Sequence, residues 1–335
     1  MADILSKDLV KALFQQKEIP RIPFIPWVCS FAAQLEQVSV EDMLSDPGTL
    51  SSSLLNAQEL FGYDAIVSAF DTTLEAEACG CGVDWGEGGA SPKVVSHPLG
   101  EGRTLESLGV AEIDKRGRIP VVLESTKRLK IVKGKQAAII GVVTGPLTLA
   151  GHLKGDAFLA DYNEGSSDAA KLIALTGSIA INLCRKYSEA GVDGIVIAEE
   201  ALGRISPDRF QVLAGPLRSI WNVLKFFNVY SVLHGGGCGE RYIAPALALQ
   251  ADALAVAANI DPLRLKEAAV SRRSCYGVSI PTPALLGDSS QVAPAIDGCL
   301  SARGKGFFLT TEWDVPYAAN VNAMHEVMAV LGDSH

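Results

Sequence analysis

The 335-residue sequence has no apolar run long enough to span a membrane. A transmembrane helix needs roughly 18 or more consecutive apolar residues. The first 20 residues, MADILSKDLVKALFQQKEIP, place charges at helical spacing and lack the apolar core of a signal peptide. The seven cysteines are an odd number without a dense framework, as is typical of reduced thiols. We therefore expect a soluble, cytoplasmic protein with no membrane partner.

Positive charge is also scarce. Lysine and arginine number 29 against 38 aspartates and glutamates, so the formal net charge is −9. Nucleic-acid binding depends on clustered lysine and arginine, and we expect no nucleic-acid partner. The basic stretch KRLKIVKGK (127–135) mixes charge with Leu, Ile and Val. It is predicted to be the solvated side of a helix end and turn.

Two common catalytic motifs are missing around the glycine-rich stretch SVLHGGGCG (231–239). No Lys-Ser or Lys-Thr follows its glycines, so it is not a P-loop. No G-x-S-x-G nucleophile elbow accompanies its HGGG, which argues against a hydrolase oxyanion loop. Cys238 as a nucleophile would need an orienting third residue that the sequence does not identify. Two interpretations remain: a zinc site using His234 and Cys238 with Glu312 or Glu199, or a tight glycine turn.

Short apolar runs rich in β-branched residues recur along the chain and alternate with helical stretches. Runs of this kind are what a parallel sheet buried on both faces requires. Eight of them favour an α/β fold of the (β/α)8 TIM-barrel type. They cover residues 21–29, 63–70, 137–144, 191–199, 228–234, 251–259, 275–281 and 306–312.

The segments between these runs support the same fold. Residues 166–190 form a long amphipathic stretch, and residues 206–227 and 261–270 open with Ser206-Pro207 and Asp261-Pro262, which are helix start signals. Residues 72–136 contain Gly-rich turns and short hairpins, and we expect them to be an insertion after strand 2 that lies over the barrel mouth. No linker divides the chain, so residues 1–335 are predicted to form one domain.

Polar residues follow most of the predicted strands. In a (β/α)8 barrel the chemistry lies at the carboxyl ends of the strands. Each residue taken alone could be structural, but their shared placement predicts a polar funnel. The strand-end residues are Cys29, Asp71, Thr144, Gly145, Pro146, Glu199, Glu200, His234, Cys238, Asn259 and Glu312.

The order of these features resembles the uroporphyrinogen decarboxylase superfamily. Within it, the chain resembles the cobalamin-dependent methyltransferases that include methylcobamide:coenzyme M methyltransferases. The resemblance covers essentially the whole chain and implies a (β/α)8 barrel. It rests on RIPFIPW (21–27), LFGYDAIVSAFDTTLEAEACGCGVDW (60–85), GVVTGPLTLAGHL (141–153), AGVDGIVIAEEALGRISPDRF (190–210), VLHGGGCG (232–239) and GKGFFLTTEWDVPYAANVNAM (304–324).

The resemblance argues against decarboxylation of uroporphyrinogen itself. Decarboxylases of this family clasp the substrate carboxylates with an arginine-containing N-terminal motif. The matching stretch here, WVCSFAAQ (27–34), contains no arginine. Guanidinium forks are the groups that bind carboxylates in this manner. Asp71 matches the catalytic aspartate of that branch, an acid that non-decarboxylating relatives also keep.

In the methyltransferase branch, a zinc ion is held by a His-x-Cys pair after the fifth strand and by a cysteine after the eighth. His234 and Cys238 match that pair with two extra glycines between them. Trp313 stands near the position of the late cysteine, and Glu312 precedes it. The resemblance thus implies zinc bound by His234, Cys238 and Glu312. A carboxylate in place of a thiolate would make zinc a stronger Lewis acid, suited to a methyl ether.

The resulting prediction is a zinc-dependent methyltransferase. It would move a methyl group between a small O-, N- or S-methylated compound and a corrinoid carried on a separate protein. Asp71, Glu199 and Glu200 would orient the substrate or handle a proton, and Gly145 and Asn259 would contact the cofactor. Two alternatives stay open: a lyase that uses Asp71 without metal, and a non-catalytic barrel that binds a corrinoid or tetrapyrrole. The oligomeric state is left open, with a homodimer among the options.

Overall fold

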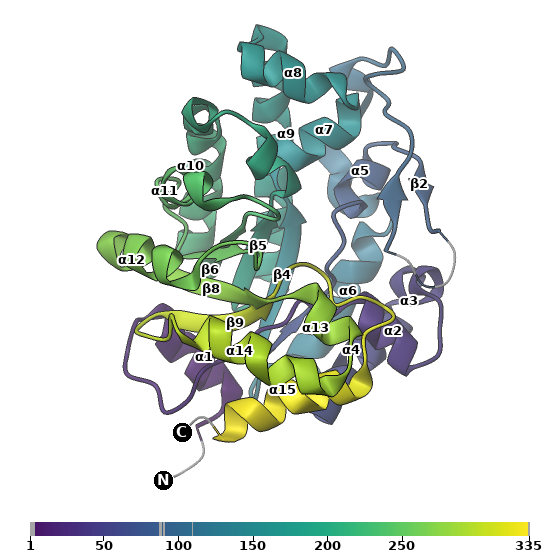
Figure 1. Ribbon diagram of the computed structural model, residues 1–335. Helices are drawn as coiled ribbons and strands as arrows, with labels where there is room; N and C mark the ends of the chain where they lie inside the picture. Colours follow the sequence, from purple (N-terminus) through teal and green to yellow (C-terminus); the bar gives the residue numbers. More distant parts are fainter. Residues whose placement is uncertain (1–3, 87–88, 90, 109, 334–335) are drawn as a thin grey trace.

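The computed structural model describes residues 4–86, 89, 91–108 and 110–333, and its centre is a curled sheet of seven parallel strands (Figure 1). Each strand pairs with the next in chain order. The strands are β1 (Ala65–Val67), β4 (Ala138–Thr144), β5 (Gly194–Ala198), β6 (Tyr230–His234), β7 (Ala253–Val256), β8 (Cys275–Ile280) and β9 (Phe307–Thr311). All seven lie inside predicted strand segments.

The predicted first strand, at 21–29, is present as a short paired segment. Ile25 N–H donates to the Leu309 carbonyl, Leu309 N–H donates to the Pro23 carbonyl, and both N···O distances are 2.9 Å. On its other side, Asp64 N–H donates to the Phe24 carbonyl, again at 2.9 Å. The segment therefore joins β9 to the chain entering β1 and closes the barrel. Prolines at 20, 23 and 26 remove ladder donors, which explains why the pairing is so short.

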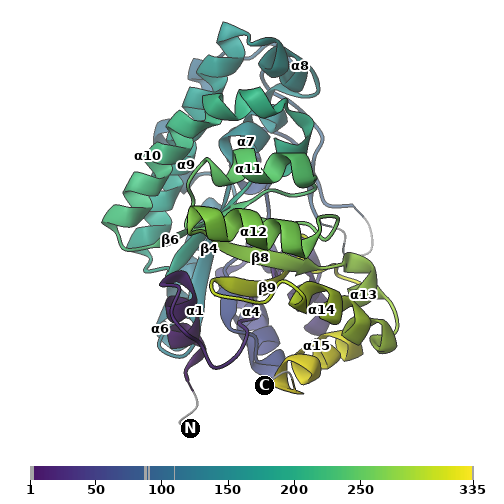
Figure 2. The ribbon, with the colours of Figure 1, turned by 60° about the vertical axis from the view of Figure 1, so that its left-hand side comes forward.

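Helices surround the sheet, as Figures 1 and 2 show from two directions. The long ones are α4 (Pro47–Phe61), α6 (Ile119–Val132), α9 (Ser167–Glu189), α10 (Phe210–Phe226), α12 (Pro262–Arg272) and α15 (Val321–Asp333). The shorter ones are α1 (Ser6–Phe14), α2 (Ser30–Leu35), α3 (Val40–Ser45), α5 (Leu74–Ala78), α7 (Pro146–Lys154), α8 (Ala157–Glu164), α11 (Ile243–Leu247), α13 (Thr282–Leu286) and α14 (Val292–Leu300). None of the described helices is long and apolar enough to cross a membrane.

One of the two predicted helix start signals is confirmed: Asp261 accepts the Leu263 N–H in front of α12. The predicted amphipathic stretch at 166–190 forms α9, and Ser166 caps it by accepting the Asp168 N–H. The second start signal differs from the prediction. After Ser206 the chain forms a 3₁₀ turn (Pro207–Arg209), and α10 begins at Phe210.

The segment after β1 contains the predicted hairpin, in which β2 (Val83–Asp84) pairs antiparallel with β3 (Lys93–Val94). It also contains an ordinary barrel helix, α6, which packs against α4. The basic stretch at 127–135 covers the last turns of α6 and the turn beyond it, as predicted. Residues 87–88, 90 and 109 of the predicted insertion lie outside the described residues.

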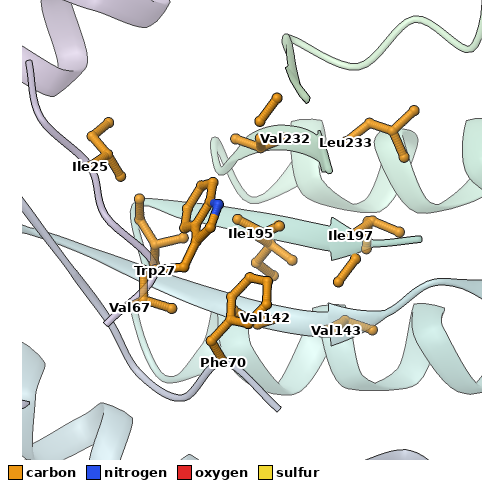
Figure 3. Packing of buried hydrophobic residues seen from close by; sticks show 14 of the residues in the cluster. Ile25, Trp27, Val67, Phe70, Val142, Val143, Ile195, Ile197, Val232 and Leu233 are labelled. Atoms are coloured by element: carbon orange, nitrogen blue, oxygen red, sulfur yellow. The ribbon is translucent and has the colours of Figure 1, made fainter. Parts of the chain in front are cut away.

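The barrel interior is filled by side chains from alternate strand positions. Val142, Val196 and Val232 are register partners and therefore share one face of the sheet, and His234 follows on that face. The stacked rings of Trp27 and Phe70 lie against this part of the core (Figure 3). The interior below the mouth is thus closed by packed residues, and open space begins only above them.

Candidate active site

A cavity of about 650 Å³ lies at the carboxyl ends of the strands. The loops after β1, β5, β6, β7 and β9 contribute to its wall, and the β2–β3 hairpin covers part of it. Among the predicted site residues, Asp71, Glu200 and Glu312 line this cavity. The structure therefore brings these three together at the mouth. Gly145, Glu199, His234, Cys238 and Asn259 are not part of its wall.

Asp71 is held in an ion pair. Its Oδ2 accepts from Arg118 Nη1 at 2.6 Å, and its Oδ1 accepts from the backbone N–H and the hydroxyl of Thr73, both at 2.7 Å. Arg118, only 6% exposed at the start of α6, also donates to Glu77 at 2.7 Å. Its guanidinium lies 4.5 Å from the ring centroid of Trp85. Asp71 is therefore a fixed carboxylate at the cavity wall.

Glu199 caps a helix. It is fully buried at the end of β5, and its carboxylate accepts the N–H groups of Leu147 (3.0 Å) and Thr148 (2.9 Å) in the first turn of α7. The Thr148 hydroxyl adds a third bond at 2.8 Å. Burial raises the pKa of Glu199 to about 7. Gly145, expected to contact a cofactor, instead leaves space for this carboxylate: a Cβ there would lie 2.1 Å from Glu199 Cδ.

Glu200 and His152 also line the cavity. Glu200 is exposed and accepts the Thr72 hydroxyl at 2.5 Å. His152, on α7, was not predicted as a site residue; its Nε2 is buried, and no hydrogen-bond partner for it is found in the described part of the chain. Burial lowers the pKa of His152, so its imidazole is neutral near pH 7. Asn259 is exposed in the loop before α12.

His234 lies beneath the cavity floor. Its ring contacts those of Trp313 (centroids 4.9 Å apart), Trp27 (5.5 Å) and Phe70 (5.9 Å), each in an edge-to-face arrangement. Its Nδ1 accepts the Gly236 N–H at 3.0 Å, and its Nε2 has no hydrogen-bond partner among the described residues. Burial lowers the pKa of His234 to about 4, which keeps the ring neutral.

The glycines of SVLHGGGCG make a tight turn. Gly236 has a φ of +50°, in the left-handed region that favours glycine. A Cβ on Gly235 would lie 2.8 Å from Cys238 Sγ, so that glycine makes room for the thiol. Burial raises the pKa of Cys238 to about 11. The stretch thus has the geometry of the turn interpretation, with a protonated thiol folded against it.

The predicted zinc ligands do not fit a metal ion in this arrangement. A neutral imidazole that bound zinc through Nε2 would carry its proton on Nδ1, where the Gly236 N–H already points. The Glu312 carboxylate accepts the N–H groups of Ala258 (3.1 Å) and Thr282 (2.7 Å). Within the described ranges, no group of three or more His, Cys, Asp or Glu side chains could hold a metal. The zinc prediction finds no support in this geometry.

Asp314 is a second cavity residue that the sequence reasoning missed. Its carboxylate accepts the backbone N–H groups of Cys29 (2.8 Å) and Ser30 (3.0 Å) at the start of α2, and also the Ser30 hydroxyl. Burial raises its pKa to about 7. The available signal was its position, three residues after the last strand. Arg118 gave no such signal, because it lies 47 residues beyond Asp71 in the segment interpreted as an insertion.

Fold and site together define an α/β barrel with a polar cavity at the carboxyl ends of its strands. The sequence matches the family described as uroporphyrinogen decarboxylase (URO-D) over residues 5–333. The chain belongs to this family.

Two curated proteins with similar sequences are methyltransferases. The chain is 25% identical over 242 residues to the methylcobamide:CoM methyltransferase MtbA of Methanosarcina acetivorans, a match that covers 70% of each chain. It is 29% identical over 178 residues to MtbA of Methanosarcina mazei, covering 52% of each. The chain thus spans about half the length of this second relative.

A solved methyltransferase from Methanosarcina mazei has the same fold. Its TM-score to this chain is 0.87, with 22% identity and 99% of both chains covered. At this identity the likeness concerns the fold alone. It confirms the (β/α)8 barrel predicted from the sequence.

Proposed function

We propose that this protein is a methyltransferase that moves a methyl group between a small methylated compound and a corrinoid carried on a separate protein. The observation that carries the proposal is the cavity at the barrel mouth, in a chain similar to methylcobamide:CoM methyltransferases. Its volume of about 650 Å³ is in the range of small-molecule sites. A corrinoid held above the mouth would face a substrate bound inside.

The chain's own residues would orient the methyl donor. Asp71 is fixed by Arg118 and Thr73, and Glu200 is bound by Thr72; both offer carboxylate oxygens at the cavity wall. Phe70 and Trp313 form an apolar floor that excludes water from below. Such positioning accelerates a transfer by holding the reacting atoms at short distance and in line. Zinc is left out of the proposal, because the predicted ligands do not fit it.

Decarboxylation of a tetrapyrrole that carries several carboxylates is a poor match to this cavity. Four of the described lining residues are acidic, namely Asp71, Glu200, Glu312 and Asp314. Arg118 neutralises Asp71, but Glu200 and Glu312 have no cationic partner among the described residues and would repel such a substrate. The arginine near the wall, Arg118, is already paired with Asp71 and Glu77. These charges favour methyl transfer over the lyase alternative.

The proposal is tested by blocking the cavity. Methyl transfer between cobalamin and a panel of methyl donors and thiol acceptors is followed by the absorption spectrum of the corrinoid. We expect the wild-type protein to accelerate transfer, and Ala257→Trp, which fills the cavity from the loop after β7, to slow it by about a hundredfold. Ala174→Trp, on the exposed side of α9, is the matched control and should leave the rate unchanged. No acceleration by wild-type protein in either direction would refute the proposal.

A further inference from the structure

The cavity floor is aromatic and rigid. Phe70 and Trp313 line it, with ring centroids 4.8 Å apart and planes at 88°. Trp27 stacks beneath Phe70 at 5.8 Å, and His234 touches all three rings from below. Because each ring is packed against at least two others, the floor keeps its shape without a ligand.

The cavity wall is acidic. Asp71 is neutralised by Arg118, and burial, which raises the pKa of Asp314 to about 7, leaves that group partly protonated. In the described part of the chain, the carboxylates of Glu200 and Glu312 accept hydrogen bonds from uncharged donors only, namely a hydroxyl and backbone N–H groups. Among the described lining residues, Lys93 is the one permanent cation, and it is exposed on the hairpin. A cavity with walls of one charge sign concentrates ligands of the opposite sign.

An aromatic floor under acidic walls is the arrangement that recognises quaternary cations. A positive charge over the face of Trp or Phe is attracted by the ring quadrupole, and more so where water is excluded. Trp313 also packs edge-to-face against His234, with ring centroids 4.9 Å apart. The residue near the position of the relatives' late cysteine is thus part of the aromatic floor of the cavity.

We infer that the cavity binds a methylated onium compound, in which the methyl-bearing nitrogen or sulfur carries a fixed positive charge. The inference rests on the proposed methyl transfer and names its substrate class. In the transfer, the carbon–nitrogen or carbon–sulfur bond breaks and its electron pair stays on nitrogen or sulfur. The methyl carbon accepts an electron pair from the Co(I) corrinoid co-substrate. The leaving group departs as a neutral amine or sulfide, so the step needs no proton and no Lewis acid.

Binding is measured by isothermal titration calorimetry with two cations, tetramethylammonium and trimethylsulfonium. The neutral control is 3,3-dimethylbutan-1-ol, which has a similar apolar head without charge. We expect at least one cation to bind about tenfold or more tightly than the alcohol, a difference in the range of a desolvated cation–π contact. The cation that binds more tightly identifies the methyl donor as an ammonium or a sulfonium compound. Equal or tighter binding of the alcohol, or no binding of either cation, overturns the inference.

Variants locate the site. Trp313→Leu should weaken cation binding by about tenfold, whereas Phe226→Leu, at an exposed ring on α10, should leave it unchanged. Glu200→Gln removes one charge at an exposed position and provides a readout if Trp313→Leu does not fold. It should weaken cation binding severalfold and leave alcohol binding unaltered. A Glu200→Gln variant with unchanged cation affinity would contradict the role assigned to the acidic wall.

The failure of this inference is distinguishable from that of the proposed function. Methyl transfer from ethers or thioethers without cation binding would refute the onium inference and keep the methyltransferase. Cation binding without any methyl transfer to a corrinoid would support the onium site and refute the proposed methyltransferase activity.

Discussion

Gly145 is a glycine because the carboxylate of Glu199 occupies the space of its side chain. Its φ of −65° and ψ of 154° are open to any residue, so the requirement is one of volume. A Cβ at this position would lie 2.1 Å from Glu199 Cδ and 2.4 Å from Oε1. The residue thus protects the cap of α7 that closes one side of the mouth.

Gly145→Ala is therefore expected to destabilise the protein by about 2 kcal/mol, the usual cost of overpacking a filled core. Urea unfolding measures it. Gly215→Ala is the matched control, since a Cβ there meets nothing within 4 Å and Gly215 lies inside α10. That variant should gain roughly 0.5–1 kcal/mol from helix propensity. Equal stability of Gly145→Ala and wild type would show that Glu199 can leave its position freely.

Glu75 gives the stability a dependence on pH. It is buried on α5 and accepts the Thr144 N–H at 3.0 Å; burial raises its pKa from 4.5 to about 7. The folded state holds this proton more tightly than the unfolded state. The stabilisation from protonated Glu75 is therefore fully present below pH 4.5 and is lost as pH rises through 7. The two pKa values differ by the equivalent of about 3 kcal/mol.

Glu75→Gln keeps an acceptor for Thr144 and removes the titration. We expect the stability of this variant relative to wild type to increase between pH 5 and pH 8, by up to about 3 kcal/mol. Thermal unfolding at several pH values measures this. The control is the exposed Glu41→Gln variant, whose stability relative to wild type should not change with pH. A difference that does not change with pH would show that Glu75 is ionised throughout.

Sequence reasoning at the level of single residues found the polar strand ends and could not assign their roles. Glu199 and Glu200 are neighbours at the end of β5, yet the first turns inward to cap α7 and the second lines the cavity. Glu312 is bound by two backbone N–H groups. Side-chain direction depends on tertiary contacts that no local pattern records.

At the scale of elements, one ion pair couples the start of α6 to the end of β1. Arg118 is 6% exposed and bonds to Asp71, Glu77 and Thr73. Removing one partner of a buried pair leaves an uncompensated charge, which is more costly than losing the pair as a whole. The pair therefore fixes Asp71 at the cavity wall.

Arg118→Leu should lower the free energy of unfolding by about 3 kcal/mol or more. Adding Asp71→Asn to this variant should restore part of the lost stability. The exposed pair Arg128–Glu124, at 3.2 Å on the same helix, offers the control. Arg128→Leu should cost less than about 0.5 kcal/mol. A double-mutant cycle in urea measures the coupling, and strictly additive effects of the two substitutions would contradict it.

The strands were predictable because parallel strands buried on both faces leave continuous apolar runs in the sequence. The first strand was predicted too long, since its prolines allow only a few backbone bonds. Only the end of helix α6 was predicted, because about 50 residues of turns and short elements separate the start of this helix from β1. Loop-rich segments carry little periodicity from which an element could be inferred.

At the scale of the whole molecule, barrel closure determines where the chemistry lies. The segment around Phe24 joins β9 to the start of β1, so the ends of all strands converge on one mouth. Residues from the first and last thirds of the chain thereby share a cavity, as Asp71 and Asp314 do. The sequence order of the strands predicted this convergence, while the aromatic floor required the three-dimensional structure.

We propose that a corrinoid meets its substrate at this mouth. Crystals of the protein grown with cobalamin, measured at the cobalt absorption edge, locate the metal of the corrinoid directly by its anomalous signal. We predict a single cobalt peak above the cavity lined by Asp71, Glu200 and Trp313. A cobalt peak at the amino-terminal end of the barrel, or no ordered cobalt, would contradict it.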